Sequence, residues 1–317
     1  MNGVVLSIAA VVLAVALIEL VLRWLDVADP PVFQYSESIG YLMRPNQSTS
    51  TRGHRFRINN AGLRGEDIGT RKLGERRAVF VGDSTCYGGG SVPDADLFVN
   101  RTAEALSALR QERVTAINAS APGWGVQNMA AFIAANGVFE ADVVVWVVPS
   151  CNFRRQKMRL YDLGYPETRP RCRLVFAATT LLSAVSNRRW RAQAAATHSV
   201  SPGAHVLAAN LAALDATFRS LSAAGIPLVM AVLPRESGYG DLANDVQRLE
   251  ATADANGAAF VDIEPAFRML RHAPLFLDGV HLSSHGHKIV ANTILPAVSA
   301  ALASRADSLP VSTVGER

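Results

Sequence analysis

The amino-acid sequence predicts an α/β fold in which a roughly five-stranded parallel sheet lies between two layers of helices. From Arg77 onward, short apolar runs alternate with longer amphipathic runs, which is the order of strand–helix–strand units. Several short runs are continuously apolar, as expected for strands that are covered by helices on both faces. Hydrophobic residues make up 49% of the 317 residues and charged residues 18%, so the chain can build a sizeable core.

The predicted strands and helices alternate regularly along the chain. The predicted strands cover Ala78–Val81, Val114–Asn118, Asp142–Val148, Ile226–Leu233 and Ala259–Ile263. The predicted helices cover Ala95–Arg110, Gln127–Asn136, Ala204–Ala224, Asp241–Ala255 and His285–Ala303. This order predicts a three-layer α/β/α sandwich.

The N-terminal segment is almost wholly apolar. Residues 3–22 contain one ionisable residue, Glu19, and at helical rise they reach about 30 Å, the thickness of a bilayer core. Glu19 lies one turn before Arg23, so the two side chains can pair near the membrane surface. We predict that residues 1–25 are a transmembrane anchor or a signal sequence. We favour the anchor, because the apolar run is long for a signal sequence and no small-x-small cleavage site follows Leu22.

The next stretch is polar and rich in turn residues. It contains Pro30-Pro31, and within it Phe56-Arg57-Ile58 alternates as an edge strand does. We predict that residues 26–75 are a linker and a small β-rich arm. The α/β domain then covers residues 76–303, and residues 304–317 form a loose polar tail.

Charge and cysteine content limit the function classes. The formal net charge of +4 is too small to indicate nucleic-acid binding, and no nucleic-acid-binding motif is present, so we expect no nucleic-acid partner. Cys86, Cys151 and Cys172 lack the paired spacing of zinc or redox motifs and are typical of buried thiols. Export of the domain would allow a Cys151–Cys172 disulfide.

Four polar segments stand where the predicted sheet would bring them together. They are Gly82-Asp83-Ser84, Asn118-Ala119-Ser120-Ala121-Pro122-Gly123, Pro149-Ser150-Cys151-Asn152 and Asp278-Gly279-Val280-His281. Three of them follow predicted strands and the fourth precedes the last predicted helix, and ligands of an open parallel sheet bind at the carboxyl ends of its strands. A serine, a histidine and a carboxylate are the nucleophile, base and orienting acid of serine acyl chemistry.

In these segments the chain resembles the SGNH (GDSL-type) hydrolases, over roughly residues 77–302 in order and spacing. The resemblance implies that Ser84 is the nucleophile and that His281 is the base, with Asp278 as its partner. It also implies that Gly123 and Asn152, together with the Ser84 N–H, donate to an oxyanion. Finally, it implies a flavodoxin-like fold in a bacterial protein whose catalytic domain is extracytoplasmic.

Structural interpretations of the same residues remain open. Asn118 can cap a turn, Asn152 can begin a loop, and His281 can be a structural histidine. We expect Asp83 to be a turn or hydrogen-bonding residue beside Ser84, not a second base. The joint occurrence of the segments favours catalysis.

The sequence also departs from the family pattern in two places. Thr85-Cys86 replaces the usual Leu after Gly-Asp-Ser, and Phe153 stands where Asp is frequent, which affects the expected substrate preference more than the chemistry. His285 and His287 follow His281, but no carboxylate or cysteine completes a ligand set, so we expect no metal and no cofactor.

A basic segment follows Asn152 directly. Residues 151–200 hold ten basic side chains and two acidic ones, and Arg154 and Arg155 are candidate substrate-binding residues. Residues 153–203 are therefore either a core-covering helix with solvated flanks, or a basic lid or interfacial helix that favours anionic substrates or lipid headgroups.

The sequence thus predicts a membrane-anchored serine esterase. O-acetyl groups of an envelope glycan are the substrate that similar anchored family members suggest. An acyltransferase using the same acyl-enzyme, a lipid esterase or lysophospholipase, and a non-catalytic glycan-binding protein are the alternatives.

Overall fold

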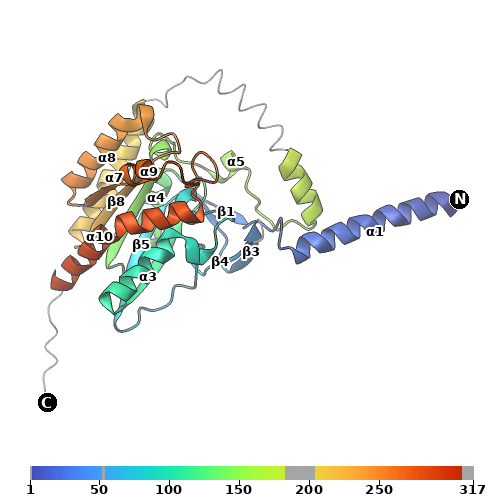
Figure 1. Cartoon of the computed structure of the whole chain (residues 1–317), viewed down its shortest axis with the longest axis horizontal. Coiled ribbons are helices and arrows are strands. Elements are labelled where there is room, and N and C mark those ends of the chain that lie inside the picture. The colour runs from blue at the N-terminus through green and yellow to red at the C-terminus, as the bar shows by residue number, and fades with distance from the viewer. Residues whose placement is uncertain (1, 52–53, 183–203, 309–317) are drawn as a thin grey trace, which may run out of the picture.

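A five-stranded parallel sheet lies between two layers of helices in this computed structural model, which describes residues 2–51, 54–182 and 204–308 (Figure 1). The predicted three-layer α/β/α class is confirmed. The central strands are β5 (Glu75–Gly82), β6 (Arg113–Ser120), β7 (Val143–Pro149), β8 (Leu228–Leu233) and β9 (Ala259–Asp262). The helices of this part are α2 (Ser84–Tyr87), α3 (Phe98–Arg110), α4 (Val126–Asn136), α5 (Leu160–Leu163), α7 (Ala204–Ala223), α8 (Ala243–Ala255), α9 (Glu264–Met269) and α10 (Ser284–Ser308).

The strand order β6-β5-β7-β8-β9 decides where a ligand can bind. β5 pairs in parallel with β6 on one side and with β7 on the other. The chain therefore changes its direction of winding between β5 and β7. In open α/β sheets the crevice outside the carboxyl ends of the strands, at such a switch point, is the usual binding site.

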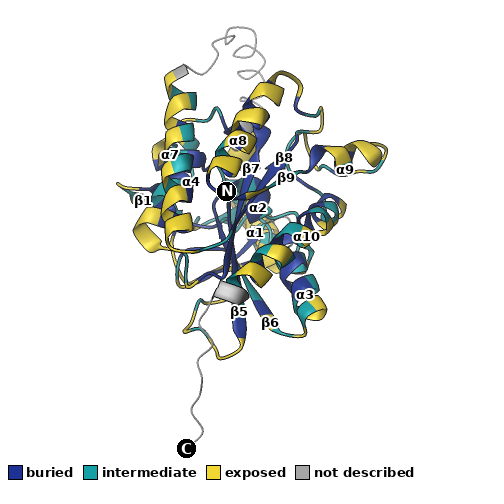
Figure 2. Ribbon diagram, turned by 90° about the vertical axis from the view of Figure 1, so that its left-hand side faces the viewer, coloured by how far each residue is buried: buried dark blue, intermediate teal, exposed yellow. Residues whose placement is uncertain are grey.

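The sheet has a hydrophobic core on each face, because successive strand residues point to opposite sides. On one face, Val79 and Val81 belong to a buried cluster with side chains of α4, α7 and α8. On the other face, Ala78 and Phe80 belong to a cluster with side chains of α3 and α10. Figure 2 shows the buried strands between helices whose outer faces are exposed. This double cover explains why the predicted strands read as continuous apolar runs.

The segment that precedes the sheet forms two antiparallel hairpins. The first pairs β1 (Phe33–Ser36) with β2 (Gly40–Met43), and the second pairs β3 (Gln47–Thr51) with β4 (His54–Ile58). β4 contains the residues expected to form an edge strand. The hairpins share the first hydrophobic cluster with β5, since Tyr41, Phe56 and Ile58 are buried in it. Arg64 forms an antiparallel bridge with Ile58 directly after the second hairpin. We call residues 33–64, the two hairpins and the turn after them, the arm.

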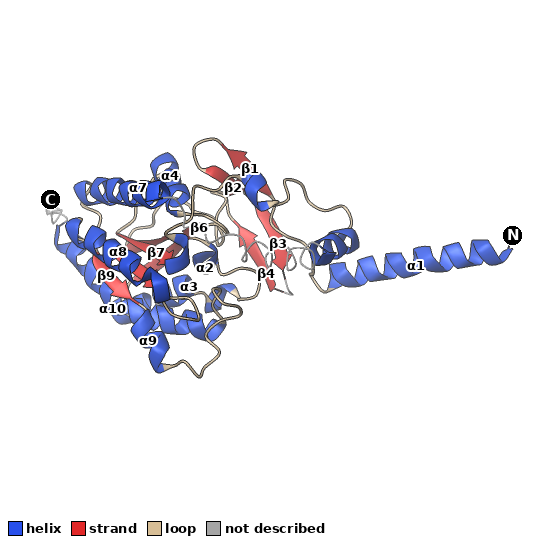
Figure 3. Cartoon of the chain, turned by 90° about the horizontal axis from the view of Figure 1, so that it is seen from above, coloured by secondary structure: helices blue, strands red, loops and turns tan. Residues whose placement is uncertain are grey.

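Helix α1 (Asn2–Trp24) extends away from the rest of the protein (Figures 1 and 3). Its segment Gly3–Trp24 is long and apolar enough to cross a membrane, and none of it is buried in the protein. A signal sequence has the same properties, so the helix alone does not separate the two predictions.

Two helix boundaries differ from the sequence-based prediction by three residues or more. α3 begins at Phe98 because residues Asp94–Asp96 form a separate 3-10 turn. α10 continues to Ser308, five residues beyond the predicted end at Ala303, and residues 309–317 of the predicted tail lie outside the described residues. The part of the predicted lid that covers residues 183–203 also lies outside them.

Candidate active site

The fold brings the sequence-predicted site residues to the carboxyl edge of the sheet. Ser84 begins α2 directly after β5, and Asn152 ends the 3-10 turn that follows β7. Gly123 lies in the loop between β6 and α4. His281 precedes α10, which packs against β7, β8 and β9. These positions lie at and beside the switch point of the sheet.

Ser84, His281 and Asp278 form a continuous hydrogen-bonded chain. His281 Nε2 lies 3.0 Å from Ser84 Oγ, and His281 Nδ1 lies 2.8 Å from Asp278 Oδ2. The side chains of His281 and Asp278 are 45% and 58% exposed. The serine and the imidazole are thus within proton-transfer distance at a site that water can reach.

The loop backbone fixes Asp278 in place. Its Oδ1 accepts the backbone N–H groups of Val280 at 2.9 Å and His281 at 2.8 Å. Partial burial alone would raise the pKa of this carboxyl. The hydrogen bonds from the His281 backbone and imidazole and from Val280 outweigh that effect, so the pKa lies below its usual value. Asp278 is therefore ionised at neutral pH and can hold an N–H on His281 Nδ1.

Asp83 connects the serine turn to Asn152. Its Oδ1 accepts the backbone N–H of Thr85 at 2.9 Å and the Thr85 hydroxyl at 2.8 Å. Its Oδ2 accepts a hydrogen bond from Asn152 Nδ2, which also lies 3.5 Å from the carbonyl of Trp124. Burial raises the pKa of Asp83, and the hydrogen bonds from Thr85 oppose this rise. The side-chain amide of Asn152 thus lies between Asp83, which precedes Ser84, and Trp124, which follows Gly123.

Gly123 occupies a position that a side chain would not fit. Its φ is +84°, and an added Cβ would lie 2.9 Å from the Tyr41 hydroxyl and 2.9 Å from Leu163 Cδ1. The Tyr41 hydroxyl donates to the carbonyl of Pro122 at 2.7 Å. The indole of Trp124 donates to the Tyr41 carbonyl at 3.3 Å. The arm therefore holds the Gly123 loop from one side.

The arm also holds the loop that follows the serine. Arg64, which is buried, donates to the carbonyls of Tyr87 at 2.9 Å and Val92 at 2.8 Å, and it pairs with Asp94 at 2.6 Å. Its guanidinium lies 4.5 Å from the ring centre of Phe56. Neither Arg64 nor Tyr41 could be predicted from the sequence, because a single arginine or tyrosine in a polar, turn-rich stretch has no local signature.

Asn118 has a structural role in the serine turn. Its Nδ2 donates to the carbonyl of Cys86 at 3.0 Å, and its Oδ1 accepts from Ser120 Oγ. The thiol of Cys86 lies 3.4 Å from the same oxygen. Burial raises the pKa of this thiol, so it stays protonated at neutral pH. Asn118 therefore ties the end of β6 to α2 instead of capping a local turn.

The two candidate arginines have different surroundings. Arg154 Nε lies 2.6 Å from the carboxylate of Asp245, which is buried, and Arg154 also pairs with Asp241 at 3.6 Å. Burial raises the pKa of Tyr165 to about 12, and the charge of Arg155 opposes this rise. Arg155 likewise opposes the rise that burial causes in the pKa of Asp83. The backbone N–H of Arg155 donates to the carbonyl of Asn152 at 2.9 Å, so Arg155 lies beside the candidate site, whereas Arg154 is engaged by α8 and its preceding turn.

The remaining candidates for metal and sulfur chemistry have other partners. Among the residues that the structure describes, no group of three or more His, Cys, Asp or Glu side chains is placed to hold a metal ion. His287 is buried and its Nδ1 accepts the backbone N–H of Phe98 at 3.2 Å. Cys172 is a free thiol that donates to a carboxylate oxygen of Glu19 at 3.4 Å, and the side chain of Cys151, its partner in the predicted disulfide, lies outside the described residues.

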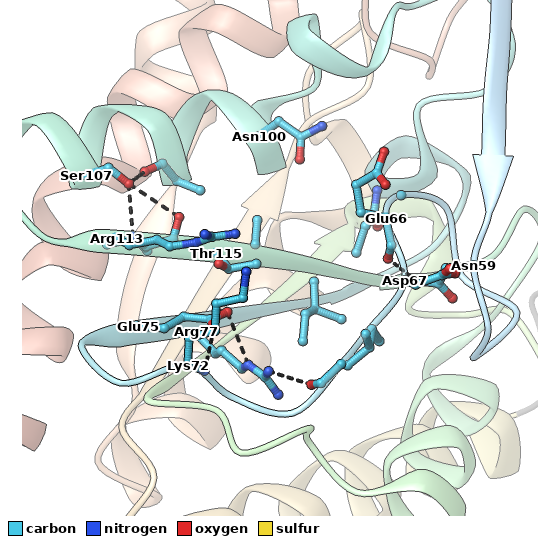
Figure 4. A pocket seen from close by; sticks show the side chains of 18 of the residues that line it. Asn59, Glu66, Asp67, Lys72, Glu75, Arg77, Asn100, Ser107, Arg113 and Thr115 are labelled. Atoms are coloured by element: carbon cyan, nitrogen blue, oxygen red, sulfur yellow. Dashed lines mark hydrogen bonds and ion pairs between the residues drawn. The ribbon is translucent and has the colours of Figure 1, made fainter.

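A cavity of about 590 Å³ lies beside the edge strand β6 (Figure 4). Its lining includes Glu75, Arg77, Arg113 and Thr115 but neither Ser84 nor His281. Charged groups of both signs line it, and Arg77 is already bonded to the carbonyl of Gly69 at 2.7 Å. The cavity lining thus includes none of Ser84, His281 and Asp278.

A flavodoxin-like sheet that carries a serine, a histidine and an aspartate at its carboxyl edge has the architecture of an SGNH hydrolase. The protein-family model of the GDSL-like Lipase/Acylhydrolase family matches residues 80–289, and the chain belongs to this family. It is therefore an ester hydrolase of the SGNH/GDSL type. A search among curated proteins gave no match.

Several solved structures resemble the chain at low sequence identity. One is a variant of an acetylxylan esterase from Geobacillus stearothermophilus, with 16% identity, a TM-score of 0.47, and coverage of 70% of this chain and 94% of that one. Another is a lipase/acylhydrolase from Enterococcus faecalis, with 16% identity, a TM-score of 0.45, and coverage of 71% and 96%. A third is an α/β hydrolase from the metagenome of Lake Arreo, with 21% identity, a TM-score of 0.42, and coverage of 72% and 96%.

Proposed function

We propose that the chain is a serine esterase that works through an acyl-enzyme, with Ser84 as nucleophile, His281 as base and Asp278 as the residue that orients it. The observation that carries this proposal is the hydrogen-bonded chain from Ser84 Oγ through the imidazole to Asp278 Oδ2, at 3.0 and 2.8 Å. A serine hydroxyl becomes nucleophilic when a base accepts its proton. The unperturbed pKa of histidine lies close enough to neutrality for this task.

The proposed reaction has two half-reactions. Ser84 Oγ attacks the ester carbonyl carbon while its proton moves to His281 Nε2, and the carbonyl oxygen becomes an oxyanion. The backbone N–H groups of Ser84 and Gly123 and the amide of Asn152 would donate to that oxygen, each contributing about 3 kcal/mol of transition-state stabilisation. The tetrahedral intermediate then collapses and expels the alcohol, which takes the proton from His281. Water then attacks the acyl-enzyme, and His281 accepts its proton and returns it to Ser84 as the carboxylic acid leaves.

We propose a short acyl group, and O-acetyl groups of an envelope glycan as the substrate. The support for a short chain is the crowding beside Gly123, where Tyr41, Leu163 and Tyr165 all lie within 3.3 Å of the position of a Cβ. This packing leaves little room for a long acyl chain next to the oxyanion donor. The support for an envelope substrate is α1, which would hold the domain at a membrane.

The exposure of the triad favours hydrolysis over transfer to a sugar hydroxyl. With 45% of the His281 side chain exposed, water has direct access to the base that must activate it. An acyltransferase needs to exclude water from the acyl-enzyme, because water competes with the acceptor. The described residues do not enclose His281 in this way.

The test compares hydrolysis of p-nitrophenyl acetate and a longer-chain p-nitrophenyl ester by the full-length protein and its Ser84→Ala variant. We expect turnover of the acetate to exceed that of the longer ester and to be lost in the variant. Release of acetate from an O-acetylated polysaccharide then tests the glycan substrate. Undiminished turnover in Ser84→Ala would refute serine catalysis, and faster turnover of the longer ester would refute the short-chain proposal.

We further propose that the catalytic domain is extracytoplasmic, held at the membrane by α1. A reporter enzyme that is active only in the cytoplasm, fused after Arg317, should remain inactive. Reporter activity would overturn this placement.

A further inference from the structure

The ionisable residue inside the apolar helix α1 has a specific set of partners. Glu19 Oε1 accepts a hydrogen bond from the guanidinium of Arg23 at 2.8 Å, one turn later, as the sequence suggests. The same carboxylate also accepts the backbone N–H groups of Arg173 at 3.1 Å and Leu174 at 2.9 Å. These two N–H groups begin the short apolar helix Arg173–Leu182, which we call the short helix. Glu19 therefore caps the short helix from more than 150 residues away in the sequence.

The two helices cap each other. The first N–H groups of a helix lack partners within it and carry partial positive charge, so a carboxylate there is stabilising. The last carbonyls of a helix lack partners in the same way, and a cation there is stabilising. Arg173 Nη1 donates to the carbonyls of Leu22 at 3.2 Å and Val27 at 3.3 Å, and its Nη2 lies 3.0 Å from Asp29 Oδ2. Each helix thus supplies the charge that the other one needs.

The arrangement fixes the direction and the depth of the short helix. In Figure 1 the short helix, unlabelled and yellow-green, rises steeply from the end of the horizontal α1, and in Figure 3 it is seen nearly end-on beside α1. The two axes therefore cross at a large angle. Glu19 lies five residues before Trp24, about 7 to 8 Å from the end of α1 at helical rise. Interfacial helices lie at this depth, about 5 to 10 Å into the headgroup and acyl boundary.

The short helix exposes large apolar side chains. Val175, Leu181 and Leu182 are 59%, 67% and 69% exposed. With ten residues the described helix reaches about 15 Å, too short to span a bilayer. Trp24, which is 83% exposed at the end of α1, is of the type that accumulates at the membrane–water interface. Arg23 lies in the last turn of α1, and Arg171 lies two residues before the start of the short helix. Anionic lipid headgroups attract basic side chains at this level.

We propose that α1 is retained in the mature protein and that α1 and the short helix form an L-shaped membrane anchor. α1 spans the lipid bilayer, and the short helix lies in the plane of its surface with Val175, Leu181 and Leu182 in the lipid. The Glu19–Arg173 contacts join the two parts. This proposal does not rest on the esterase reaction, because lipid contact is measured without activity.

The anchor also gives the catalytic edge a fixed orientation. α10 begins next to His281 on the side of the domain from which α1 extends, and it ends on the far side (Figure 1). The carboxyl edge of the sheet therefore faces the membrane side of the protein. A flexible tether would leave this orientation free, whereas contact of two crossed helices with the same bilayer fixes it.

The first test measures lipid contact of the short helix in the full-length protein, reconstituted in phosphatidylglycerol–phosphatidylethanolamine vesicles. A benzoylphenylalanine photo-crosslinker replaces Leu181 in one protein and Leu109 of α3 in the other, because these leucines are equally exposed, at 67% and 65%. Mass spectrometry after illumination should find at least about tenfold more lipid adduct at position 181, since only that position reaches the acyl region. Equal lipid adduct at both positions would overturn the proposal.

The second test removes the joint between the helices. Glu19→Leu should lower lipid adduct formation at position 181 about fivefold, the factor that corresponds to a typical helix cap. Ser7→Leu is the matched control in α1, because Ser7 bonds only the carbonyl of Gly3 within its own helix. Hydrolysis of a soluble ester should be unchanged in both variants, which excludes a general folding defect. Unchanged adduct formation in Glu19→Leu would show that Glu19 does not hold the short helix.

The third test determines whether α1 is retained. The intact mass of the protein purified from cell membranes should include residues 1–25. Cleavage after this segment would remove Glu19 and leave the N–H groups of Arg173 and Leu174 without their acceptor. A mature protein that lacks these residues would overturn the proposal, whatever its esterase activity.

Discussion

Replacement of Gly123 by alanine should damage both stability and catalysis, in amounts that the structure allows to be separated. The φ of +84° lies in the left-handed region, where an L-residue with a Cβ loses about 1–2 kcal/mol. The new methyl group would also lie 2.9 Å from the Tyr41 hydroxyl and from Leu163 Cδ1. The shifts of side chains and backbone that accommodate such overpacking typically lower stability by a further ~1–3 kcal/mol. The free energy of unfolding should therefore fall by about 2–5 kcal/mol.

A matched control isolates the contact with the arm. Gly257 has a φ of +67° and nothing within 4 Å of its Cβ position, so Gly257→Ala carries the backbone strain without the clash. Urea unfolding of full-length protein in detergent should show a loss of about 1–2 kcal/mol for Gly257→Ala. The difference between the two variants measures the packing of Tyr41 and Leu163 on the Gly123 loop.

The same pair of variants tests the oxyanion-hole role. A shift of the Gly123 N–H should lower kcat about 10²- to 10³-fold on p-nitrophenyl acetate, whereas Gly257→Ala should leave kcat unchanged. Equal stability of the two variants would refute the packing argument. A kcat for Gly123→Ala within about twofold of the parent protein would refute the role of Gly123 in the reaction.

Four further predictions concern individual side chains. Asp278→Asn should lower kcat about 10²- to 10⁴-fold by leaving His281 in the wrong tautomer, and a loss below tenfold would contradict this role. Asn152→Ala should lower kcat about 10²- to 10³-fold with little change in KM, so a change in KM alone would argue for a binding role instead. Burial lowers the pKa of His287 to about 3, so as pH falls the unfolded chain takes up this proton before the folded one does, and the free energy of unfolding should fall between pH 6.5 and pH 3 by up to about 1.4 kcal/mol per pH unit. Urea unfolding of His287→Gln should show a flatter pH dependence, and an unchanged slope would contradict this role of His287. Arg155→Ala should lower kcat/KM on an anionic ester more than on a neutral one, and equal losses would exclude a charge-recognition role.

Much of the site could be predicted because its parts are local. Ser84, Asn152 and the Asp278–His281 pair each lie in a short segment next to a strand or a helix that has a clear apolar pattern. The rule that strand ends meet at one edge of a parallel sheet then brings these segments together without further information. The Asp278–His281 contact needs only a three-residue turn, so even its hydrogen bond follows from the spacing.

Contacts between distant segments could not be predicted in this way. Tyr41 and Arg64 belong to a polar stretch whose role depends on where the arm packs, and no periodicity marks that position. The partners of Glu19 lie more than 150 residues away, at the start of the short helix. The sequence predicts only the pairing of Glu19 with Arg23, because the two residues are one helical turn apart.

The sequence by itself determined the fold class, the apolar N-terminal helix and the candidate catalytic residues, because hydrophobic period and strand–loop order are local properties. The tertiary structure alone decided that the arm supports the Gly123 loop and the loop after Ser84. It also decided that Arg154 is engaged by Asp245 while Arg155 lies beside Asn152, and that Glu19 caps the short helix. The physical reason is that a side chain's partner is set by packing. Residues that pack together in space have no regular spacing along the chain, so no sequence pattern predicts their contact.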